Sequence, residues 1–247
     1  MDEVKATVAE FELPCGHLEG DKVFDRVVIR EMTGVEEDIL AERNGSFISR
    51  MNQVIANCII RIFGDEGSIE DRGRMVEIVR NLSVGDRVVL MFLLRRVSIG
   101  DNFDFKIRCG NCNKELAMTV NLGDLKIKKS SDPRKRLFDL VLPSGKKVKC
   151  RIMTGVGEEA VDKIRNSGGD ILTAGIFIRI AEIDGKPPLM DEVKRLSLKD
   201  RNAIRKETGK IEGSIETSVS VKCNECGNDF ETGIDVTQAG FFFPAET

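Results

Sequence analysis

The chain repeats itself, and this internal repeat constrains the fold more than any other feature of the sequence. Four pairs of segments match in order along the chain: LPCG (13–16) with LPSG (142–145), VVIREMTGVEED (27–38) with KVKCRIMTGVGEE (147–159), LSVGDR (82–87) with LSLKDR (196–201), and Cys-x-x-Cys at 109–112 with Cys-x-x-Cys at 223–226. The last two pairs are each 114 positions apart, so the final third of one copy aligns with that of the other without a gap. We therefore expect a duplicated domain.

The repeat predicts where the domains begin and end. We expect a first copy over residues 1–125 and a second over 137–247. Between them, KIKKSSDPRKR (126–136) combines six basic residues with Ser, Asp and Pro, which is typical of a solvated linker.

Each copy predicts the same α+β domain, with an N-terminal β segment, a helical middle and a C-terminal zinc-ribbon-like β-hairpin. In copy one, Thr33 and Glu36 match the T-x-x-E capping box of a helix start. Apolar residues then recur every three or four positions from 47 to 63, which predicts one long helix, with its counterpart at about 171–183. Further helices are expected after Leu82 and Leu196.

The apolar period changes to two in the last part of each copy, which indicates paired strands. The alternation ends at Cys109 and resumes at Leu116 in copy one, and it ends at Cys223 and resumes at Phe230 in copy two. Each Cys-x-x-Cys pair is therefore expected at the tip of a β-hairpin, where a tight turn directs two thiolates the same way.

Such a hairpin supplies two of the four ligands that a closed structural zinc site takes. In most zinc ribbons the second pair follows about 15–20 residues later, whereas 110 residues lie between Cys112 and Cys223 here. Two similar domains packed about a pseudo-twofold axis would bring their hairpin tips together. We predict one zinc ion shared by Cys109, Cys112, Cys223 and Cys226.

Three other interpretations of the cysteine pairs remain open. Each pair could bind its own zinc with help from Cys15, His17, Cys58 or Cys150, although copy two has Ser and Lys opposite the first two, and the last two resemble buried packing cysteines. The pairs could be redox dithiols, although that chemistry favours a cysteine at a helix N-terminus and a strand follows here. They could also be metal-free remnants of an ancestor.

Composition excludes several classes of protein. The longest apolar run, VVLMFLL (88–94), is too short to cross a bilayer, and the first ten residues contain no apolar signal core. We therefore expect a chain with reduced thiols in a cytosol-like compartment. A net charge of −3 and a pI near 5.5 argue against general binding to polyanions. With a single histidine, His17, the chain is short of the usual carrier of acid–base catalysis.

Two motifs resemble catalytic or phosphate-binding sequences, and both are better explained by helix starts. GVGEEA (155–160) matches a dinucleotide-binding fingerprint, but its counterpart in copy one lacks the second glycine, and both copies place glutamates where a phosphate would need free amides. The acidic groups at 36–38 and 158–159 fall in the first turn of predicted helices, where negative charge is favoured. We predict no catalytic residues and no small-molecule site.

The end of the chain differs between the copies. GFFFP (240–244) aligns with KIKKS (126–130) of copy one. We expect Phe241–Phe243 either to close the core of copy two or to dock on a partner protein.

The order of these elements resembles the baseplate hub and hub-assembly proteins of contractile-tailed bacteriophages. The matching segments are Leu13, Pro14, Gly16, Arg30–Glu37, Cys109 and Cys112 in copy one, and Leu142, Pro143, Gly145, Arg151–Glu159, Cys223 and Cys226 in copy two. The resemblance implies a non-enzymatic role, with other baseplate or hub proteins as partners, either in the virion or in the host cytoplasm during assembly. The family pattern carries one Cys hairpin, so the second is a departure from it.

Two other functions compete with a structural adaptor. A zinc-ribbon protein of transcription or translation would need basic hairpins, but residues 101–122 and 216–235 together hold four basic and eight acidic residues. A thiol oxidoreductase is the enzyme most compatible with the cysteines, and redox-silent thiols holding zinc would exclude it.

Overall fold

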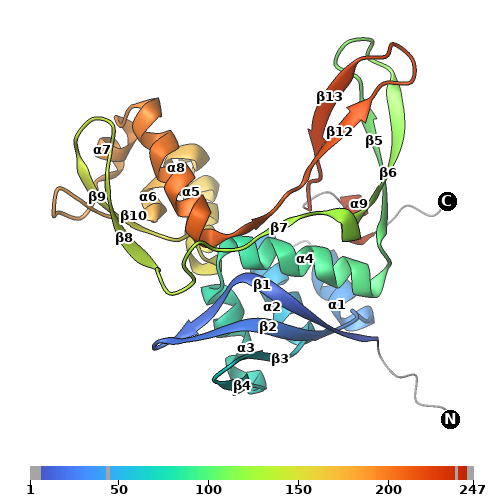
Figure 1. Cartoon of the computed structure of the whole chain (residues 1–247), viewed down its shortest axis with the longest axis horizontal. Coiled ribbons are helices and arrows are strands. Elements are labelled where there is room, and N and C mark those ends of the chain that lie inside the picture. The colour runs from blue at the N-terminus through green and yellow to red at the C-terminus, as the bar shows by residue number, and fades with distance from the viewer. Residues whose placement is uncertain (1–6, 43–44, 237–238, 244–247) are drawn as a thin grey trace.

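The computed structural model describes residues 7–42, 45–236 and 239–243, and it is a mixed α+β protein, as the sequence predicts (Figure 1). The N-terminal half contains β1 (Val8–Glu19), β2 (Lys22–Arg30), α1 (Gly34–Ala41), α2 (Phe47–Cys58), β3 (Ile59–Gly64), β4 (Gly67–Ile69), α3 (Arg72–Asn81), α4 (Val84–Ser98), β5 (Asn102–Arg108), β6 (Glu115–Asn121) and a short 3₁₀ turn (Leu122–Asp124). The C-terminal half contains β7 (Ile127–Lys128), β8 (Leu137–Val141), β9 (Lys147–Arg151), α5 (Gly155–Asn166), α6 (Ile171–Arg179), β10 (Ile180–Ile183), α7 (Met190–Lys194), α8 (Leu198–Glu212), β11 (Ser214–Ile215), β12 (Ser218–Lys222), β13 (Asp229–Gly233) and α9 (Ala239–Phe242).

An antiparallel sheet of order β1-β2-β3-β4 lies at the base of the N-terminal half. Val27 and Ile29 of β2 alternate with more exposed residues, and both are fully buried. Their side chains join those of α2, α3 and α4 in the largest apolar core of the molecule. Most of this core therefore belongs to the N-terminal half, and it follows the period of two in strands and of 3.6 in helices.

The apolar run from 47 to 63 is a helix only as far as Cys58, so the prediction of one long helix is wrong at its C-terminal end. The next residues form β3, in which Ile62 pairs with Val27 of β2. Ile59 and Ile60 are β-branched, which favours an extended backbone once a partner strand is available. The helix predicted at about 171–183 is also shorter than expected. Helix α6 ends at Arg179, and β10 begins at Ile180.

The C-terminal half has a smaller three-stranded sheet of order β10-β9-β8, with α6, α7 and α8 around a separate core. The helix starts of the two halves differ in detail. Thr33 and Glu36 form the predicted capping box of α1, whereas Thr154 makes no such side-chain bond at the start of α5. The position of the capping glutamate is Gly157, where an added Cβ would lie 2.6 Å from the sulfur of Met153. Close packing against Met153 thus leaves no room for a capping side chain at Gly157.

The segment expected to be a solvated linker is mostly exposed, but it is hydrogen-bonded to both halves. Its β7 pairs with β11. The amides of Ser130 and Ser131 donate to the carbonyls of Pro14 (2.7 Å) and Lys210 (2.9 Å). Arg136 donates to the Cys15 sulfur and to the Gly16 carbonyl. The backbone bonds of this segment therefore fix the path between the halves.

Phe241 and Phe242, near the C-terminus, do not close the core of copy two, which was one of the two places expected for the phenylalanines. Phe241 is fully buried and packs edge-on against Phe92 and Phe103, with ring centroids 5.2 and 5.4 Å apart. Phe242 belongs to the same core, which is that of the N-terminal half. The chain end reaches this core because β12 and β13 stand beside β5 and β6, so that α9 falls at the base of the first hairpin (Figure 1).

The two halves meet where α5 packs against α2, α3 and α4. Arg80 donates twice to Glu159 (2.9 and 2.7 Å), and Asn52 donates to the same carboxylate (2.8 Å). Arg87, which is buried, forms an ion pair with Glu158. GVGEEA is thus a helix start, as predicted, and its glutamates bind side chains of the other half.

Candidate metal centre

Two β-hairpins project from the body of the molecule and pack against each other (Figure 1). Strands β5 and β6 pair from Asn102↔Asn121 to Arg108↔Glu115, and β12 and β13 pair from Ser218↔Gly233 to Lys222↔Asp229. Among the described residues, no ladder joins one hairpin to the other. They meet instead through inward-facing side chains, including Leu116, Val221 and two of the four cysteines.

The loops at the two tips have the same backbone hydrogen bonds. In the first, the Cys109 amide donates to Lys114 O and the Asn113 amide donates to Cys109 O, both at 2.9 Å. In the second, Cys223 makes both equivalent bonds at the same lengths. Each loop ends in the left-handed region, at Asn113 (φ 59°) and Gly227 (φ 73°), which asparagine and glycine tolerate best. Each loop therefore places two cysteines on one side of a tight turn.

The four predicted ligands converge at these tips. The Cys109 and Cys226 sulfurs lie 3.7 Å apart, the Cys112 and Cys223 sulfurs lie 3.7 Å apart, and all four lie within 4.8 Å of one another. These separations are far beyond a disulfide bond of about 2.05 Å, and the cysteines are free thiols. The two short contacts each join a cysteine of one hairpin to a cysteine of the other.

Backbone amides stabilise the ionised form of two of these thiols. The amides of Cys112 and Asn111 lower the pKa of Cys109. The amide of Asn228 and the side chain of Asn111 lower the pKa of Cys226 to about 6. A hydrogen bond to a thiolate favours the charged form, so both loops are suited to hold anionic sulfur.

The remaining thiols limit how much negative charge the cluster holds by itself. The amide of Lys114 acts to lower the pKa of Cys112, but burial and the hydrogen bonds with Cys226, Cys223 and Cys109 raise it to about 12. A thiol surrounded by other sulfurs loses its proton reluctantly, because the negative charges repel one another. A cation among them would reverse that preference.

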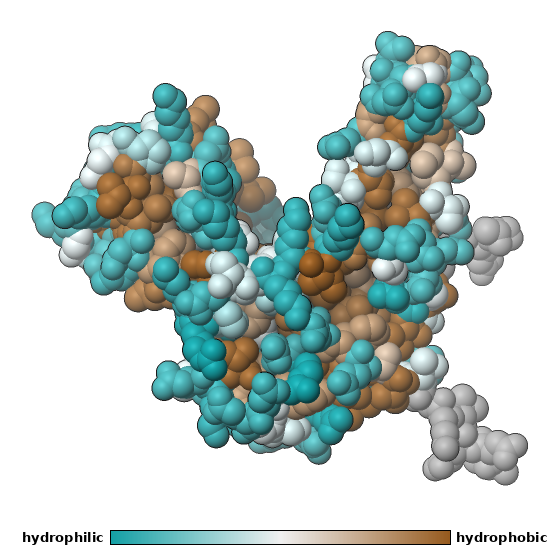
Figure 2. Space-filling model, viewed as in Figure 1, coloured by the Kyte–Doolittle hydropathy of each residue, from teal (hydrophilic) through white to brown (hydrophobic). Residues whose placement is uncertain are grey.

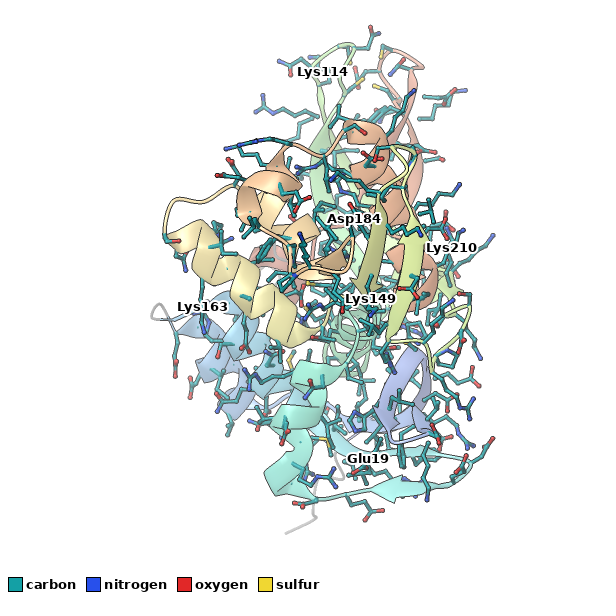
Figure 3. All side chains as sticks on the ribbon, turned by 90° about the vertical axis from the view of Figure 1, so that its left-hand side faces the viewer. Glu19, Lys114, Lys149, Lys163, Asp184 and Lys210 are labelled. Carbon is teal, nitrogen blue, oxygen red and sulfur yellow. The ribbon has the colours of Figure 1, made fainter. Side chains whose placement is uncertain are left out.

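The cluster lies at an outer end of the molecule. Lys114, which follows Cys112 by two positions, is at the opposite end from Glu19 of β1 (Figure 3). Cys109 and Cys223 are buried between the hairpins, whereas Cys112 is half-buried and Cys226 is exposed. The surface around the tip is largely hydrophilic (Figure 2). Solvent thus reaches one side of the cluster.

Asn111 is a residue of this site that sequence reasoning missed. Its side-chain amide reaches across to the other hairpin and lies 3.6 Å from the Cys226 sulfur. The only sequence signal is a polar residue inside the first Cys-x-x-Cys loop, where many residues would fit.

The other candidate ligands lie elsewhere. Cys15, Cys58 and Cys150 are fully buried in the two halves, and burial raises the pKa of each thiol to about 11, 12 and 11 respectively. Burial also lowers the pKa of His17. Within the described chain, the four-cysteine group includes none of these residues. Cys58 and Cys150 pack in the apolar cores of their halves, as expected.

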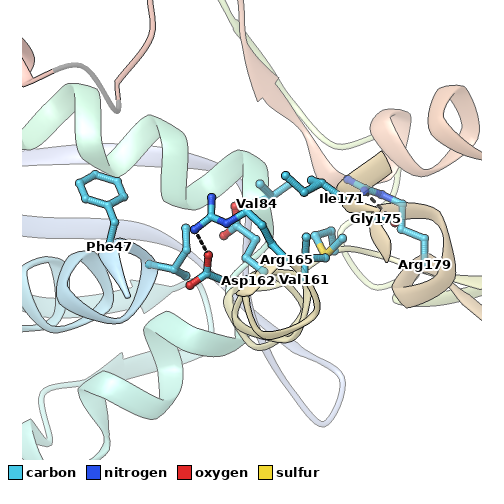
Figure 4. A pocket seen from close by; sticks show the side chains of 11 residues that line it. Phe47, Val84, Val161, Asp162, Arg165, Ile171, Gly175 and Arg179 are labelled. Carbon is cyan, nitrogen blue, oxygen red and sulfur yellow. Dashed lines mark hydrogen bonds and ion pairs between the residues drawn. The ribbon is translucent and has the colours of Figure 1, made fainter. Parts of the chain in front are cut away.

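A cavity of ≈ 540 Å³ lies at the junction of the halves, between Phe47 of α2 and Gly175 of α6 (Figure 4). Its ionic groups already have partners: Arg165 pairs with Asp162 within the lining, and Arg179 and Glu158 pair with Glu212 and Arg87 outside it. The cavity is thus lined by apolar side chains and neutralised charges.

The fold and the site together are those of an α+β protein in which two β-hairpins bring four thiols together. The family model for T4 bacteriophage base plate protein matches residues 9–244, and the chain belongs to this family. No curated protein and no solved structure matches it. The membership supports a structural role in the phage tail baseplate, in contact with other tail proteins. None of the helices in the described ranges has the length and apolar character needed to cross a bilayer.

Proposed function

We propose that this protein is a zinc-binding, non-enzymatic component of the hub region of a contractile phage baseplate, where it acts as an adaptor between other proteins. The observation that carries the proposal is the convergence of four thiols from two distant segments, all within 4.8 Å of one another. Family membership supports the baseplate. The proposal goes further than family membership in placing the protein at the hub and in giving it a role in assembly in the host cytoplasm.

The sulfur positions suit zinc. In a tetrahedral site with Zn–S bonds of about 2.3 Å, the sulfurs are about 3.8 Å apart, close to the two contacts of 3.7 Å. Four protein ligands close the coordination sphere, which is typical of structural rather than catalytic zinc. Cys109, Cys112, Cys223 and Cys226 would hold the ion, and the Asn111 amide would act as an outer partner of Cys226.

A duplicated domain explains why the ligands come from segments so far apart. The limits that we propose are 1–125 and 137–247, joined by 126–136. Equivalent residues make equivalent bonds: Asp86 accepts from the amides of Cys15 and Gly16, and Asp200, 114 positions later, accepts from the amide of Ser144. Both aspartates follow a serine N-cap, at α4 and α8. In this proposal zinc crosslinks the hairpins of the two copies.

Metal analysis of purified protein tests the shared site. We expect one zinc per chain, and none in Cys223→Ser, because three thiols with one open position hold zinc much more weakly. Asn224→Ser is the matched control, since it changes an exposed residue of the same loop without removing a thiol. It should retain one zinc.

Three results would contradict this site. Two zinc ions per chain, or retention of about half the metal by Cys223→Ser, would mean separate sites, and no zinc after reducing purification would mean that the cluster does not bind it.

Mass spectrometry of purified tails and of assembly intermediates tests the baseplate role. Absence from both would refute it.

A further inference from the structure

At the junction between the halves, a surface formed by α2, α3 and α4 binds the start of α5. The first turn of α5 presents Glu158 and Glu159 to a socket formed by α2, α3 and α4. In that socket Arg87 donates from Nε to the Asn52 side chain at 3.0 Å, which holds the guanidinium toward Glu158. Arg80 and Asn52 bind Glu159. An acidic helix N-terminus is thus the ligand of this socket.

The C-terminal half has an equivalent socket on α6, α7 and α8. Two offsets define the equivalence: Ile59 and Ile180 each begin a strand directly after a helix, 121 positions apart, and the last part of each half aligns at 114 positions. The residues of the first socket, Asn52, Arg80 and Arg87, correspond in this way to Thr173, Lys194 and Arg201. Both terminal guanidinium nitrogens of Arg201 lie 3.4 Å from the Thr173 hydroxyl, so the link between the two helices is present here too.

Among the described residues, Asp170 is the carboxylate bonded in this second socket, and no glutamate pair of another helix start is docked there. In the described ranges Arg201 forms no ion pair, although it is buried, and Lys194 bonds only to Asp170, with both side chains 63% exposed. Leu172 and Leu198 are 73% and 75% exposed, whereas Met51, the equivalent of Leu172, is 1% exposed. Lys194 and the two leucines therefore face solvent, whereas the first socket is covered.

We propose that the face formed by Thr173, Lys194, Leu198 and Arg201 docks an acidic helix N-terminus of a partner protein. The chemistry required is a pair of consecutive carboxylates in the first helical turn, because that is what the equivalent socket binds and what the basic residues here complement. The inference deepens the proposed adaptor role and rests on it and on the duplication.

A second copy of this chain does not fit in the same way. At the internal junction, a Cβ on Gly85 would lie 2.2 Å from the carbonyl oxygen of Gly213, so only glycine allows α4 and the end of α8 to approach. The equivalent of Gly85 is Lys199. Head-to-tail docking of whole copies would place this side chain against the corresponding backbone, whereas a helix without such a neighbour meets no obstacle. The partner is accordingly another protein.

A peptide of residues 152–166 of this chain, labelled with a fluorophore, is the probe, since it carries the acidic helix start that the first socket binds. Fluorescence anisotropy with the intact zinc-loaded protein should show saturable binding. Changing Glu158 and Glu159 of the peptide to Gln, or Lys194 of the protein to Gln, should weaken it about tenfold or more, the range expected for charge-assisted hydrogen bonds. Lys210→Gln is the matched control, because Lys210 is also a half-exposed helix lysine with one acidic partner, and it should bind as the wild type does (Figure 3).

Other outcomes would overturn the inference. No binding at millimolar peptide, or equal loss in Lys194→Gln and Lys210→Gln, would mean that the face is not a socket. Self-association that sedimentation detects and Lys194→Gln abolishes would assign the face to a second copy instead. Zinc content separates this test from that of the metal site, because Lys194→Gln should still hold one zinc.

Discussion

Glu36 is a carboxylate that is buried at the start of α1 and fully hydrogen-bonded. Arg30 donates to both of its oxygens, at 2.9 and 3.0 Å, and the amide and hydroxyl of Thr33 each donate at 2.9 Å. Burial acts to raise the pKa of Glu36, but the bonds from Arg30 and Thr33 outweigh it and lower the pKa to about 2. The charge therefore stabilises the folded state.

Replacing Glu36 by Gln should lower the free energy of unfolding at neutral pH by roughly 3 kcal/mol, since the pKa falls from 4.5 to about 2 and one pKa unit corresponds to about 1.4 kcal/mol. The folded pKa lies below the ordinary value of 4.5, so this contribution is complete above pH 4.5 and disappears as the pH falls toward 2. Urea unfolding at several pH values measures it. Glu37→Gln, at an exposed neighbour, should change stability by less than about 0.5 kcal/mol. A wild-type-to-variant difference for Glu36 that stays constant down to pH 2 would contradict the assignment.

Helix α9 is short, but its position is important for the packing of the N-terminal half. Its four residues put Phe241 and Phe242 into the core of the half that is distant in sequence. The rings of Phe241 and Phe242 also meet edge-on, with centroids 4.9 Å apart, and the Arg95 guanidinium lies 5.1 Å from the Phe103 ring centroid. The first half is therefore complete only when the end of the chain is in place.

Phe241→Ala should destabilise the protein by about 3–5 kcal/mol, the usual cost of removing a buried phenylalanine. The loss should appear in the N-terminal half, as faster hydrogen exchange in α4 around Phe92. Phe243→Ala is the control, because that ring is 38% exposed, and its effect should be below about 1 kcal/mol. Faster exchange confined to the C-terminal half would refute the packing of α9 described here.

At the scale of the whole molecule, the halves are joined at several places, and two of these contacts lie far apart. One is the junction of α5 with α2, α3 and α4. The other is the hairpin pair, which in the described chain has side-chain packing but no shared ladder. A zinc ion at the tips would add coordinate bonds between hairpins that share no backbone ladder in the described chain, and structural zinc contributes on the order of 10 kcal/mol to folding.

Removal of zinc with a chelator should therefore loosen the hairpins and the element that follows them. Hydrogen exchange is expected to accelerate in β5, β6, β12, β13 and α9, while α6 and α8 keep their protection, because their core lies apart from the hairpins. Adding zinc back should restore the original exchange, and magnesium, which prefers oxygen ligands, should not. Unchanged exchange in β12 and β13 after verified metal loss would show that packing alone holds the pair.

Local patterns predicted much of the secondary structure. The Thr33 capping box, the helices after Leu82 and Leu196, and the hairpins ending at Cys109 and Cys223 all follow from periods and spacings in short windows. The helix predicted to run past Cys58 failed because Ile59 finds a partner strand in β2, and such partners are invisible in a window of sequence. Asn111 could not be singled out, since its role depends on a sulfur 115 positions away.

The sequence by itself determined the α+β class, the outline of each half and the identity of the four converging cysteines, because these depend on side-chain periodicity and on repeated spacing. Only the tertiary structure decided that residues 126–136 are bonded to both halves, that Glu158 and Glu159 bind arginines of the first half, and that Phe241 fills the first core rather than the second. The physical reason is that burial and ion pairing are satisfied by whichever groups the folded chain brings within a few ångströms. The separation of two residues along the sequence does not reveal whether they are close in space.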